Sequence, residues 1–460
     1  MATDQRTLSC SELNRIFVQM ASYRDPQLIP TLLDLVRRAA NPDRLRVVVC
    51  WQHDLDELIG SFFAHGFSTW HVISKDGYTC HNLRLGDAVV ELIDVPAMQT
   101  RGACWARNLI QQHYEGEAYT LQLDSHHRFV DGWDEILVEM LERLRGESKR
   151  PVLTAYLPAF DPECDPASRA QTPLAMHFDS FVAEGAVCFM PGAMPDWASR
   201  SRPLPARFYS AHFAFADGHF ACNVQHDPEY FFLGEEISIS ARAFTHGYDL
   251  YHPHRLIAWH EYTRKGRTKV WDDHSAGNKE KGLVDMHWCE RNDLSFRRNR
   301  ILFGMDGEEP STIDFGKFGF GAVRTLAQYE AYAGISFSLR GVKPNVLERC
   351  PPVPGSPVPA TEDEYRAGLQ RSNNFRVAIH RNELGDLQLV ETACFEVYGQ
   401  GIDVLHRYTM SAAQLAASME GDWLMSKFVF LSAPDAKPAR CILRLAGPDG
   451  APLVEIERLL

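Results

Sequence analysis

Residues 45–51, LRVVVCW, constrain the fold of this chain more than any other segment. The run has the length of a strand and is almost wholly apolar, which is typical of a strand covered by helices on both faces of a parallel sheet. Comparable runs recur at 14–20, 89–95, 117–123 and 151–158. Between them, helical patterns begin at Asp25-Pro26 and cover 55–64, 101–113 and 132–145. This alternation predicts an α/β domain with a doubly wound, mostly parallel sheet.

The pattern becomes irregular after residue 158 and changes again near residue 350. We expect a strand over 207–215, a helix over 235–246, short strands around Tyr248 and at 256–259, and loops and helices over 263–300. The segment CPPVPGSPVP, 350–359, is typical of a proline-rich linker. Short β-prone runs with turns follow it. The predicted organisation is an α/β domain at 12–349, a linker at 350–362 and a β-rich, sandwich-like accessory domain at 363–460.

Composition limits the functional class. The chain has 460 residues, of which 45% are hydrophobic, so it can bury a large core. Its net charge is −13 and its pI is about 5.8, which argues against a nucleic-acid binder and against docking on anionic lipid. One local basic cluster, formed by Arg264, Lys265, Arg267 and Lys269, is able to serve a single anionic ligand.

The sequence also favours a cytoplasmic protein without membrane insertion. The first residues lack the apolar core of a signal peptide, and no window of about 20 residues is apolar enough to span a bilayer. The 11 cysteines are scattered and include no Cys-x-x-Cys pair. Such cysteines are expected to be reduced thiols in a cytosolic protein.

The strongest candidate for chemistry is YTLQLDSH, 119–126, where a strand of the buried type ends in an Asp-x-His pair. Residues two apart in a strand point the same way. If the strand register continues, Asp124 and His126 project together at the carboxyl end of the strand, where open α/β sheets bind ligands. A carboxylate and an imidazole with open positions suit a divalent ion, such as Mn²⁺, that also holds a phosphate. The alternative is an accidental pair.

Two later segments offer further groups. In YFFLGEEISIS, 230–240, an apolar run stops at Gly234, and Glu235 and Glu236 open a helix. Acids there complement the helix dipole, whereas two together favour a pocket wall. His260 lies in a histidine-rich region that lacks the His-Glu-x-x-His helix or cysteine pairs of a zinc site. Because it ends a predicted strand and precedes basic residues, His260 is the candidate for a third metal ligand.

Two segments place arginines near the predicted ligand edge. RGACWARN, 101–108, puts Arg107 in the first turns of a helix, where arginine meets phosphate or carboxylate. The alternative is a solvated helix with Trp105 in the core. SYRD, 22–25, follows the first strand, where a nucleotide would lie in such a sheet. Its alternative is an ordinary helix N-cap.

Together and in this order, these segments resemble the retaining nucleotide-sugar glycosyltransferases of the GT-A fold, most of all the polypeptide N-acetylhexosaminyltransferases. Asp124-Ser125-His126 is similar to the Asp-x-His metal motif of the mucin-type GalNAc-transferases, and 231–264 is similar to their Gly-Glu segment and distant ligand histidine. The closer resemblance is to the cytoplasmic GlcNAc-transferases that modify hydroxyproline on a ubiquitin-ligase subunit. It covers roughly residues 12–345 and rests on SYRDP at 22–26, RGACWARN at 101–108, LQLDSHHRF at 121–129 and GEEISISARAFTHGYDLYHP at 234–253.

The resemblance implies a donor, a site and a mechanism. Mn²⁺ or Mg²⁺, held by Asp124, His126 and His260, would bridge the diphosphate of the donor UDP-GlcNAc. Arg264 would stabilise the departing diphosphate, and Glu235 and Glu236 would hold sugar hydroxyls or the acceptor. The nucleotide and donor sugar would contact Ser22, Arg24, Asp25, Arg107, Asp124 and Ser125. Front-face attack, with the departing phosphate oxygen as base, would retain the configuration, and the acceptor would be a hydroxyl of hydroxyproline, serine or threonine on a polypeptide.

Other readings of the same residues stay open. A metal-dependent hydrolase of nucleotide sugars or phosphodiesters would use similar groups without preferring an acceptor. Another UDP-sugar, or a small-molecule or glycan acceptor, also fits the motifs. A non-catalytic binding module would be expected to lose its metal ligands, and all three are present here. The domain at 363–460 either recruits a protein acceptor or braces the catalytic domain, and no sequence feature indicates an oligomeric state.

Overall fold

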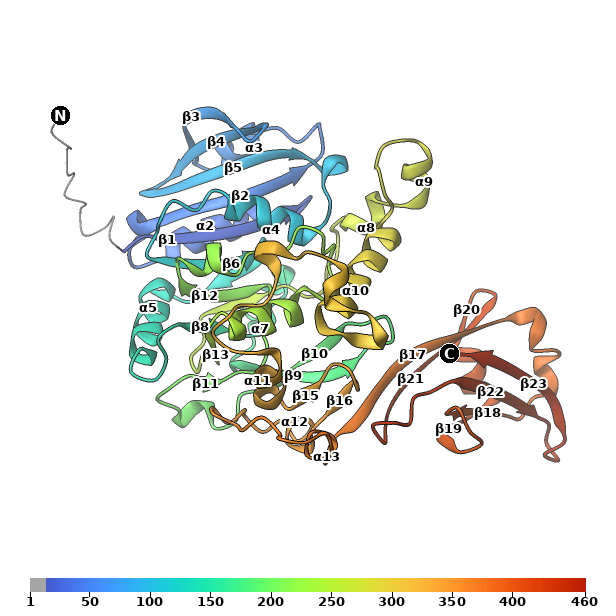
Figure 1. Cartoon of the computed structure of the whole chain (residues 1–460). Helices are drawn as coiled ribbons and strands as arrows, with labels where there is room; N and C mark the ends of the chain where they lie inside the picture. The colour runs from blue at the N-terminus through green and yellow to red at the C-terminus, as the bar shows by residue number, and fades with distance from the viewer. Residues whose placement is uncertain (1–13) are drawn as a thin grey trace.

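A ten-stranded mixed sheet lies at the centre of the α/β body. The computed structural model describes residues 14–460, so residues 12 and 13 of the predicted domain lie outside the described residues. Figure 1 shows the sheet in blue to green. Its spatial order is β11 (Leu204–Pro205), β13 (Asp249–His252), β8 (Pro151–Thr154), β12 (Phe213–Asp217), β6 (Tyr119–Asp124), β1 (Ile16–Tyr23), β2 (Leu45–His53), β5 (Ala88–Pro96), β4 (Tyr78–Leu85) and β3 (Ser68–Lys75).

The centre of this sheet is parallel. β6, β1, β2 and β5 run in one direction, with Ala21 of β1 opposite Asp124 of β6. Every residue of β2 is buried, as expected for a strand covered on both faces. β12 pairs antiparallel with β6, and β4 and β3 form an antiparallel hairpin at the other edge. The predicted α/β class is confirmed, and the carboxyl ends of β1, β2 and β6 meet at one edge of the sheet.

Helices cover both faces of the sheet. α2 (Leu28–Arg38) and α5 (Trp133–Leu144) share a core with β1, β2 and β6 on one face. α4 (Ala103–Gln111) and α7 (Glu235–Thr245) cover the other face. The remaining α-helices of the described residues are α3 (Gly60–Ala64), α6 (Phe220–Asn223), α8 (Val270–Asp273), α9 (Ala276–Glu280), α10 (Trp288–Phe303), α11 (Leu326–Ala333), α12 (Pro344–Leu347), α13 (Glu362–Arg366) and α14 (Ala412–Ala417). Of the helices in residues 14–460, none is both long and apolar enough to cross a membrane.

Two small antiparallel sheets accompany the central one. β9 (Leu174–Phe181) and β10 (Val187–Ala193) form a hairpin. β7 (His127–Phe129) follows β6 almost directly and pairs with β14 (Ala258–His260). This second pairing brings a distant part of the chain to the carboxyl end of β6.

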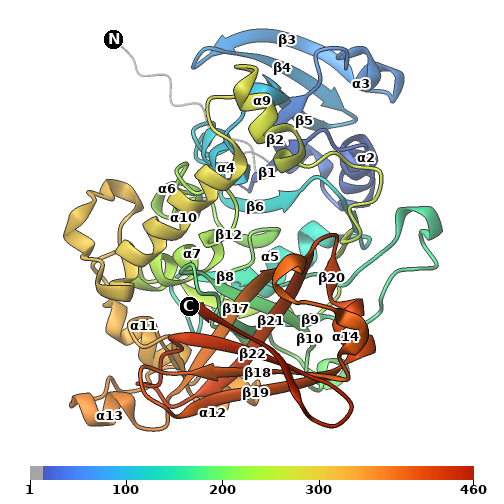
Figure 2. The same cartoon turned by 90° about the vertical axis from the view of Figure 1, so that its right-hand side faces the viewer.

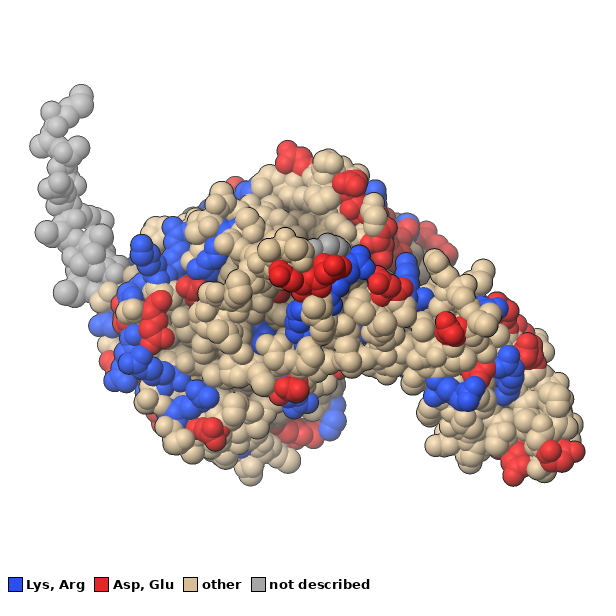
Figure 3. Space-filling view, turned by 60° about the horizontal axis from the view of Figure 1, so that its bottom comes forward, with Lys and Arg blue, Asp and Glu red and all other residues tan. Residues whose placement is uncertain are grey.

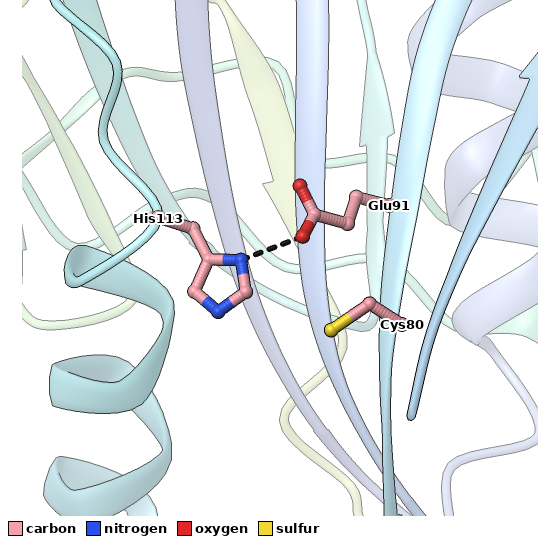
Figure 4. Close-up of side chains that lie close together, drawn as sticks. All are labelled: Cys80, Glu91 and His113. Atoms are coloured by element: carbon pink, nitrogen blue, oxygen red, sulfur yellow. Dashed lines mark hydrogen bonds and ion pairs between the residues drawn. The ribbon is translucent and has the colours of Figure 1, made fainter. Parts of the chain in front are cut away.

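A buried polar network holds the end of α4 against the sheet (Figure 4). His113, just beyond α4, places Nδ1 2.6 Å from Oε1 of Glu91 on β5, and Cys80 of β4 lies beside them. Arg46 of β2 donates to Glu91 Oε2 at 2.9 Å and to Glu117 Oε1 at 2.8 Å. The buried carboxylates therefore have cationic partners within the network, and α4 is fixed relative to β2 and β5.

The C-terminal strands form two sheets packed face to face. The inner sheet contains β15 (Ile335–Ser336), β16 (Gly341–Val342), β17 (Gln370–His380), β21 (Trp423–Ser432) and β20 (Met419–Glu420). The outer sheet contains β19 (Val404–Ser411), β18 (Thr392–Tyr398), β22 (Arg440–Ala446) and β23 (Pro452–Leu459). Apolar side chains from both sheets, such as Phe395 and Phe428, fill the space between them. The resulting lobe projects from the body in Figures 1 and 3 and faces the viewer in Figure 2. The pairing of β17 with β16 ties it to the preceding chain.

Some predicted elements differ from the observed ones. The strand predicted over 207–215 is wrong for 207–212, because amides there bond to side chains instead of a neighbouring strand: Tyr209 N–H donates to Ser240 Oγ and Ser210 N–H to Thr154 Oγ1. The helix predicted over 55–64 is shortened to α3, and the turns before it are mostly exposed. β3 and β4 were not predicted. The helix expected at 235–246 is confirmed as α7.

Candidate active site

Asp124 stands at the carboxyl end of β6, on the edge where the parallel strands end. The strand register does not continue beyond it, since the chain bends at Ser125 and β7 begins at His127. Asp25 accounts for this departure, because its Oδ2 accepts a hydrogen bond from Ser125 Oγ at 2.7 Å and lies 2.7 Å from His126 Nδ1. Asp124 and His126 converge all the same, with His126 Nε2 3.8 Å from Asp124 Oδ2.

β14 brings His260 to the same place. It pairs with β7 so that His260 lies opposite His127, and His260 Nε2 is 3.6 Å from Asp124 Oδ2. One possible ligand atom each of Asp124, His126 and His260 lies within 4.8 Å of the other two. We call these three residues the triad.

The ionisation of the triad suits a cation. Burial alone would raise the pKa of Asp124, but His260, Arg107 and His126 hold it well below its usual range. Burial lowers the pKa of His260 well below its usual range, so its ring is neutral. Neither ring nitrogen of His260 has a hydrogen-bond partner among the described residues, although buried polar atoms normally have one. A carboxylate and two imidazoles arranged in this way fit Mn²⁺ or a similar divalent ion.

Asp25 supports one side of the triad. It accepts a hydrogen bond from Arg267 Nη1 at 2.9 Å, in addition to its contacts with Ser125 and His126. Burial would raise its pKa, but His126, Arg267 and Ser125 lower it to about 2. Asp25 is therefore an anion that engages Nδ1 of His126 and leaves Nε2 of that ring toward Asp124.

Arg107 of α4 supports the other side. Its Nη2 donates to Asp124 Oδ1 at 2.9 Å, and its Nη1 lies 3.5 Å from Glu235 Oε1. Burial would lower the pKa of Arg107, but Asp124 raises it above its usual value. The guanidinium therefore stays charged and binds one oxygen of Asp124, while the other oxygen is the one near the two histidines.

A cavity of about 310 Å³ opens over the triad. Arg264, Arg267 and Lys269 give its wall positive charge, and the Arg264 guanidinium lies 5.4 Å from the centroid of the Trp271 ring. The other lining residues outside the triad are Ala21, Tyr23, Asp25, Gln52, Gly102, Ala103, Arg107, Ser125, Phe232, Tyr262, Thr268 and Val270. Cations and aromatic rings around a metal-type triad suit an anionic ligand that also carries a planar group.

The cavity brings most of the predicted site residues together and leaves four outside its lining. Ser22 is buried, and its carbonyl accepts a hydrogen bond from Gln52 Nε2 at 3.1 Å. Arg24 donates to Asp273 of α8 at 2.7 and 2.9 Å. The predicted residues that line the cavity are Asp25, Arg107, Asp124, Ser125, His126, His260 and Arg264, whereas Ser22, Arg24, Glu235 and Glu236 do not.

Glu235 and Glu236 open α7 behind the triad. Gly234 turns the chain into this helix with a φ of 102°. Glu236 accepts hydrogen bonds from Ala211 N–H and from Tyr156 Oη–H, both at 2.9 Å. Burial raises the pKa of both carboxyls, and the charge of Glu235 raises that of Glu236 further.

The aromatic part of the wall was missed from the sequence. Tyr23, Phe232, Tyr262 and Trp271 line the cavity, but none of them was singled out. The position of two of them was an available signal, because Tyr262 and Trp271 flank the basic cluster at 264–269 in the chain. Aromatic rings interleaved with cations are typical of sites for ligands with both a charge and a planar group.

Three comparisons relate the chain to known proteins. A sequence model of the family described as "Glycosyltransferase (GlcNAc)" matches residues 15–339, whereas no curated protein matches the chain in sequence. Among solved structures, GalNAc-T7 with UDP, GalNAc and Mn²⁺ is 11% identical, with 96% of this chain and 71% of that chain covered and a TM-score of 0.46. The structure of S. aureus TarS 1-349 with UDP is 9% identical, with coverages of 65% and 75% and a TM-score of 0.33. The mannosyltransferase PcManGT from Pyrobaculum calidifontis, with GDP-Man and Mn²⁺, is 12% identical, with coverages of 63% and 61% and a TM-score of 0.32.

Proposed function

The chain belongs to the GlcNAc glycosyltransferase family, and we propose that it is a retaining, metal-dependent transferase of the GT-A fold. Its donor is UDP-GlcNAc, and its acceptor is a hydroxyl of hydroxyproline, serine or threonine on a polypeptide. The observation that carries this proposal is the convergence of Asp124, His126 and His260 under a cavity whose wall includes Arg264 and Arg267. Such a site suits a divalent ion and a diphosphate at the same point.

The triad would hold the ion, Mn²⁺ or Mg²⁺. When bound, this ion supplies Lewis-acid stabilisation of the charge that develops on departing UDP. Arg107 binds Asp124 and Asp25 binds His126, so supporting residues orient two of the three ligands in advance.

Arg264 and Arg267 would stabilise the diphosphate. Burial lowers the pKa of Arg264, so an anion beside it would favour its charged form. Arg267 bonds to Asp25, which places its guanidinium next to His126. Two guanidinium groups on one wall offer several donors to phosphate oxygens, and this is the role that arginine performs better than lysine.

The acids of the cavity wall support retention without an enzymatic nucleophile. Among the described lining residues, only Asp25 and Asp124 are carboxylic acids. Asp25 is bonded to Ser125 and Arg267, and Asp124 to Arg107. We therefore favour front-face attack, in which the acceptor oxygen bonds to the anomeric carbon as the bond to UDP breaks, and a phosphate oxygen of UDP takes the acceptor proton.

Four predicted site residues take indirect roles in this proposal. Glu235 would position Arg107, and Glu236 would position the segment around Ala211. Contacts of either acid with the sugar or the acceptor stay a prediction. Arg24 anchors α8 beside the cavity through Asp273, and Ser22 fixes Gln52 of the cavity wall.

The proposal keeps the predicted domains and places the protein in the cytoplasm. Residues 12–349 perform catalysis, 350–362 link, and 363–460 form the accessory domain. The cysteines between residues 50 and 441 are all free thiols, which suits a reducing compartment. A net charge of −13 disfavours a nucleic acid as partner.

Release of UDP from UDP-GlcNAc, measured with and without Mn²⁺, tests the proposal. The native chain should release UDP only with the metal, and His260→Ala should lose about 10³-fold in rate. His254→Ala is the matched control, because His254 is also buried but does not line the cavity. It should release UDP at the native rate. A native chain that neither releases nor binds UDP would reject the donor assignment.

The same assay separates the transferase from its rivals. Peptides that contain hydroxyproline, serine or threonine should accelerate UDP release from a transferase. Release that no hydroxyl acceptor changes would indicate a nucleotide-sugar hydrolase. Faster turnover of UDP-glucose or UDP-galactose than of UDP-GlcNAc would overturn the choice of sugar.

A further inference from the structure

The inner sheet turns one face away from the core of the lobe. Figures 1 and 2 show β17 and β21 between the outer sheet and the α/β body. Side chains alternate along a strand, and Val377 and Phe428 point into the core. Their neighbours Arg376 and Lys427 are therefore on the opposite face, where both are exposed.

Two cations lie directly opposite each other on this face. Arg376 of β17 is in register with Lys427 of β21. Within residues 14–460, neither side chain has an ion pair or a hydrogen bond. Like charges opposite each other repel and destabilise a sheet. The pair is thus better suited to an anionic partner than to the free protein.

Apolar side chains flank the two cations along β21. Trp423, Val429 and Leu431 are 47%, 50% and 43% exposed, respectively, and each is an even number of residues from Lys427. We call the surface formed by Arg376, Lys427 and these three residues the free face. Among the strands of the inner sheet, the acid nearest in register to these cations is Glu420 of β20. It is opposite Trp423, at the start of β21 and away from Lys427. Exposed apolar residues grouped in this way are typical of a protein interaction surface.

The free face adjoins the body that carries the cavity. Near the start of β17, Asn374 Nδ2 donates to Ser180 Oγ of β9 at 2.7 Å. On β10, burial raises the pKa of the Cys188 thiol to about 11, and Lys427 is close enough to act against this rise. Asp179 of β9 and Glu236 at the start of α7 act on Cys188 in the opposite direction to Lys427, and Asp179 has the larger effect. The β9–β10 hairpin is therefore the part of the body that lies nearest the free face.

We propose that the free face docks an acidic and partly apolar segment of the polypeptide that accepts the sugar. This inference rests on the proposed transferase function and specifies its acceptor. Carboxylates of the segment pair with Arg376 and Lys427, and its apolar side chains cover Trp423, Val429 and Leu431. A nucleic acid or an anionic membrane is less suitable, because the net charge of −13 repels an extended polyanion. A short segment is affected mainly by charges within about 10 Å.

Binding of a fluorescein-labelled peptide of alternating glutamate and leucine, followed by anisotropy on the full chain, tests the docking. We expect Arg376→Glu and Lys427→Glu each to weaken binding about tenfold or more, and added salt to weaken binding to the native chain. Lys149→Glu is the matched control, since Lys149 is exposed and has no ion pair with a described residue. It changes the net charge equally and should bind as the native chain does. Equal binding by all these proteins would overturn the docking.

Two further arms separate the possible partners and the two proposals. A lysine-leucine peptide should not bind. In a competition experiment, an acidic protein should displace the acidic peptide. Displacement by single-stranded DNA or phosphatidylserine vesicles, but not by an acidic protein, would overturn the polypeptide assignment. Metal-dependent UDP release should be the same for Lys427→Glu and the native chain. If native UDP release fails while peptide binding depends on Lys427, the transferase proposal fails and the docking surface stands. If UDP release is normal and Lys427→Glu binds the peptide as the native chain does, only the docking proposal is rejected.

Discussion

His212 stacks on His260, with ring centroids 4.4 Å apart and planes inclined by 28°. Tyr262 contacts the same ring edge-on, with centroids 4.2 Å apart. No described residue forms a hydrogen bond with either ring nitrogen of His260, so aromatic contacts set its orientation. The rings of His212 and Tyr262 are closer to it than those of His126 and His127. Metal-binding histidines more often depend on a hydrogen bond to their second nitrogen for this purpose.

We therefore expect His212→Ala to weaken Mn²⁺ binding about 10–100-fold, as measured by calorimetric titration without donor. His212→Phe is the matched control. Both variants lose the hydrogen bond that His212 Nε2 accepts from Leu157 N–H at 3.0 Å, but only phenylalanine keeps a ring against His260. Binding of Mn²⁺ that is equally weak in both variants would show that stacking does not position this ligand.

Arg107 should be important for stability as well as for the site. It is buried between Asp124 and Glu235, and Arg107→Ala leaves Asp124 without its cation. We expect a loss of about 3–5 kcal/mol in the free energy of unfolding, measured by urea titration. The control is Arg143→Ala, which removes an exposed pair with Glu139 and should change this free energy by less than about 0.5 kcal/mol. Similar losses in the two variants would contradict the structural role of Arg107.

The sequence predicted the centre of the sheet well because burial on both faces is encoded locally. Each strand there is apolar along its length, as residues 45–51 illustrate. The strand prediction was wrong for residues 207–212 because their hydrogen bonds are not encoded locally. Their amides bond to side chains of Thr154 and Ser240, and no local pattern encodes partners so far away in the chain.

The site likewise contains residues that local sequence patterns predicted and residues that they did not. Asp124, His126 and His260 each follow an apolar run, so strand ends could be used to find them. The cavity wall around Trp271 depends on the α8 segment. A hydrogen bond from Arg24, the residue after β1, to Asp273 attaches this segment across 249 residues of the chain. The positions of such wall residues follow from tertiary contacts, which the sequence does not display.

Stability should fall as pH rises because of Glu236. Burial raises its pKa above the usual value of 4.5, so the folded state keeps a proton that the unfolded state loses. Its contribution is therefore largest below pH 4.5, decreases as pH rises toward the folded pKa, and is constant above it. Glu236→Gln cannot ionise and should flatten this part of the profile in urea unfolding at a series of pH values. Glu229→Gln, at an exposed position, should keep the native slope, and a native slope in Glu236→Gln would contradict the assignment.

The cluster of Cys80, Glu91 and His113 (Figure 4) should behave as a charge network and not as a second metal site. Both oxygens of Glu91 are already engaged, Oε1 by His113 and Oε2 by Arg46. Burial raises the pKa of Cys80 to about 11, so its thiol stays protonated and adds no charge. We expect Glu91→Ala to lower the free energy of unfolding by about 3–5 kcal/mol and Cys80→Ala by only about 1 kcal/mol.

Urea unfolding with and without a chelator separates the two readings of this cluster. A charge network loses stability when Glu91 is removed, is little affected when Cys80 is removed, and does not respond to EDTA. In a metal site, the thiolate and the carboxylate would both be ligands, so Cys80→Ala would be as damaging as Glu91→Ala. EDTA would then destabilise the native chain and have less effect on either variant. Because the triad also suits a metal, the chelator arm uses His260→Ala as the background, so that any remaining response comes from the cluster.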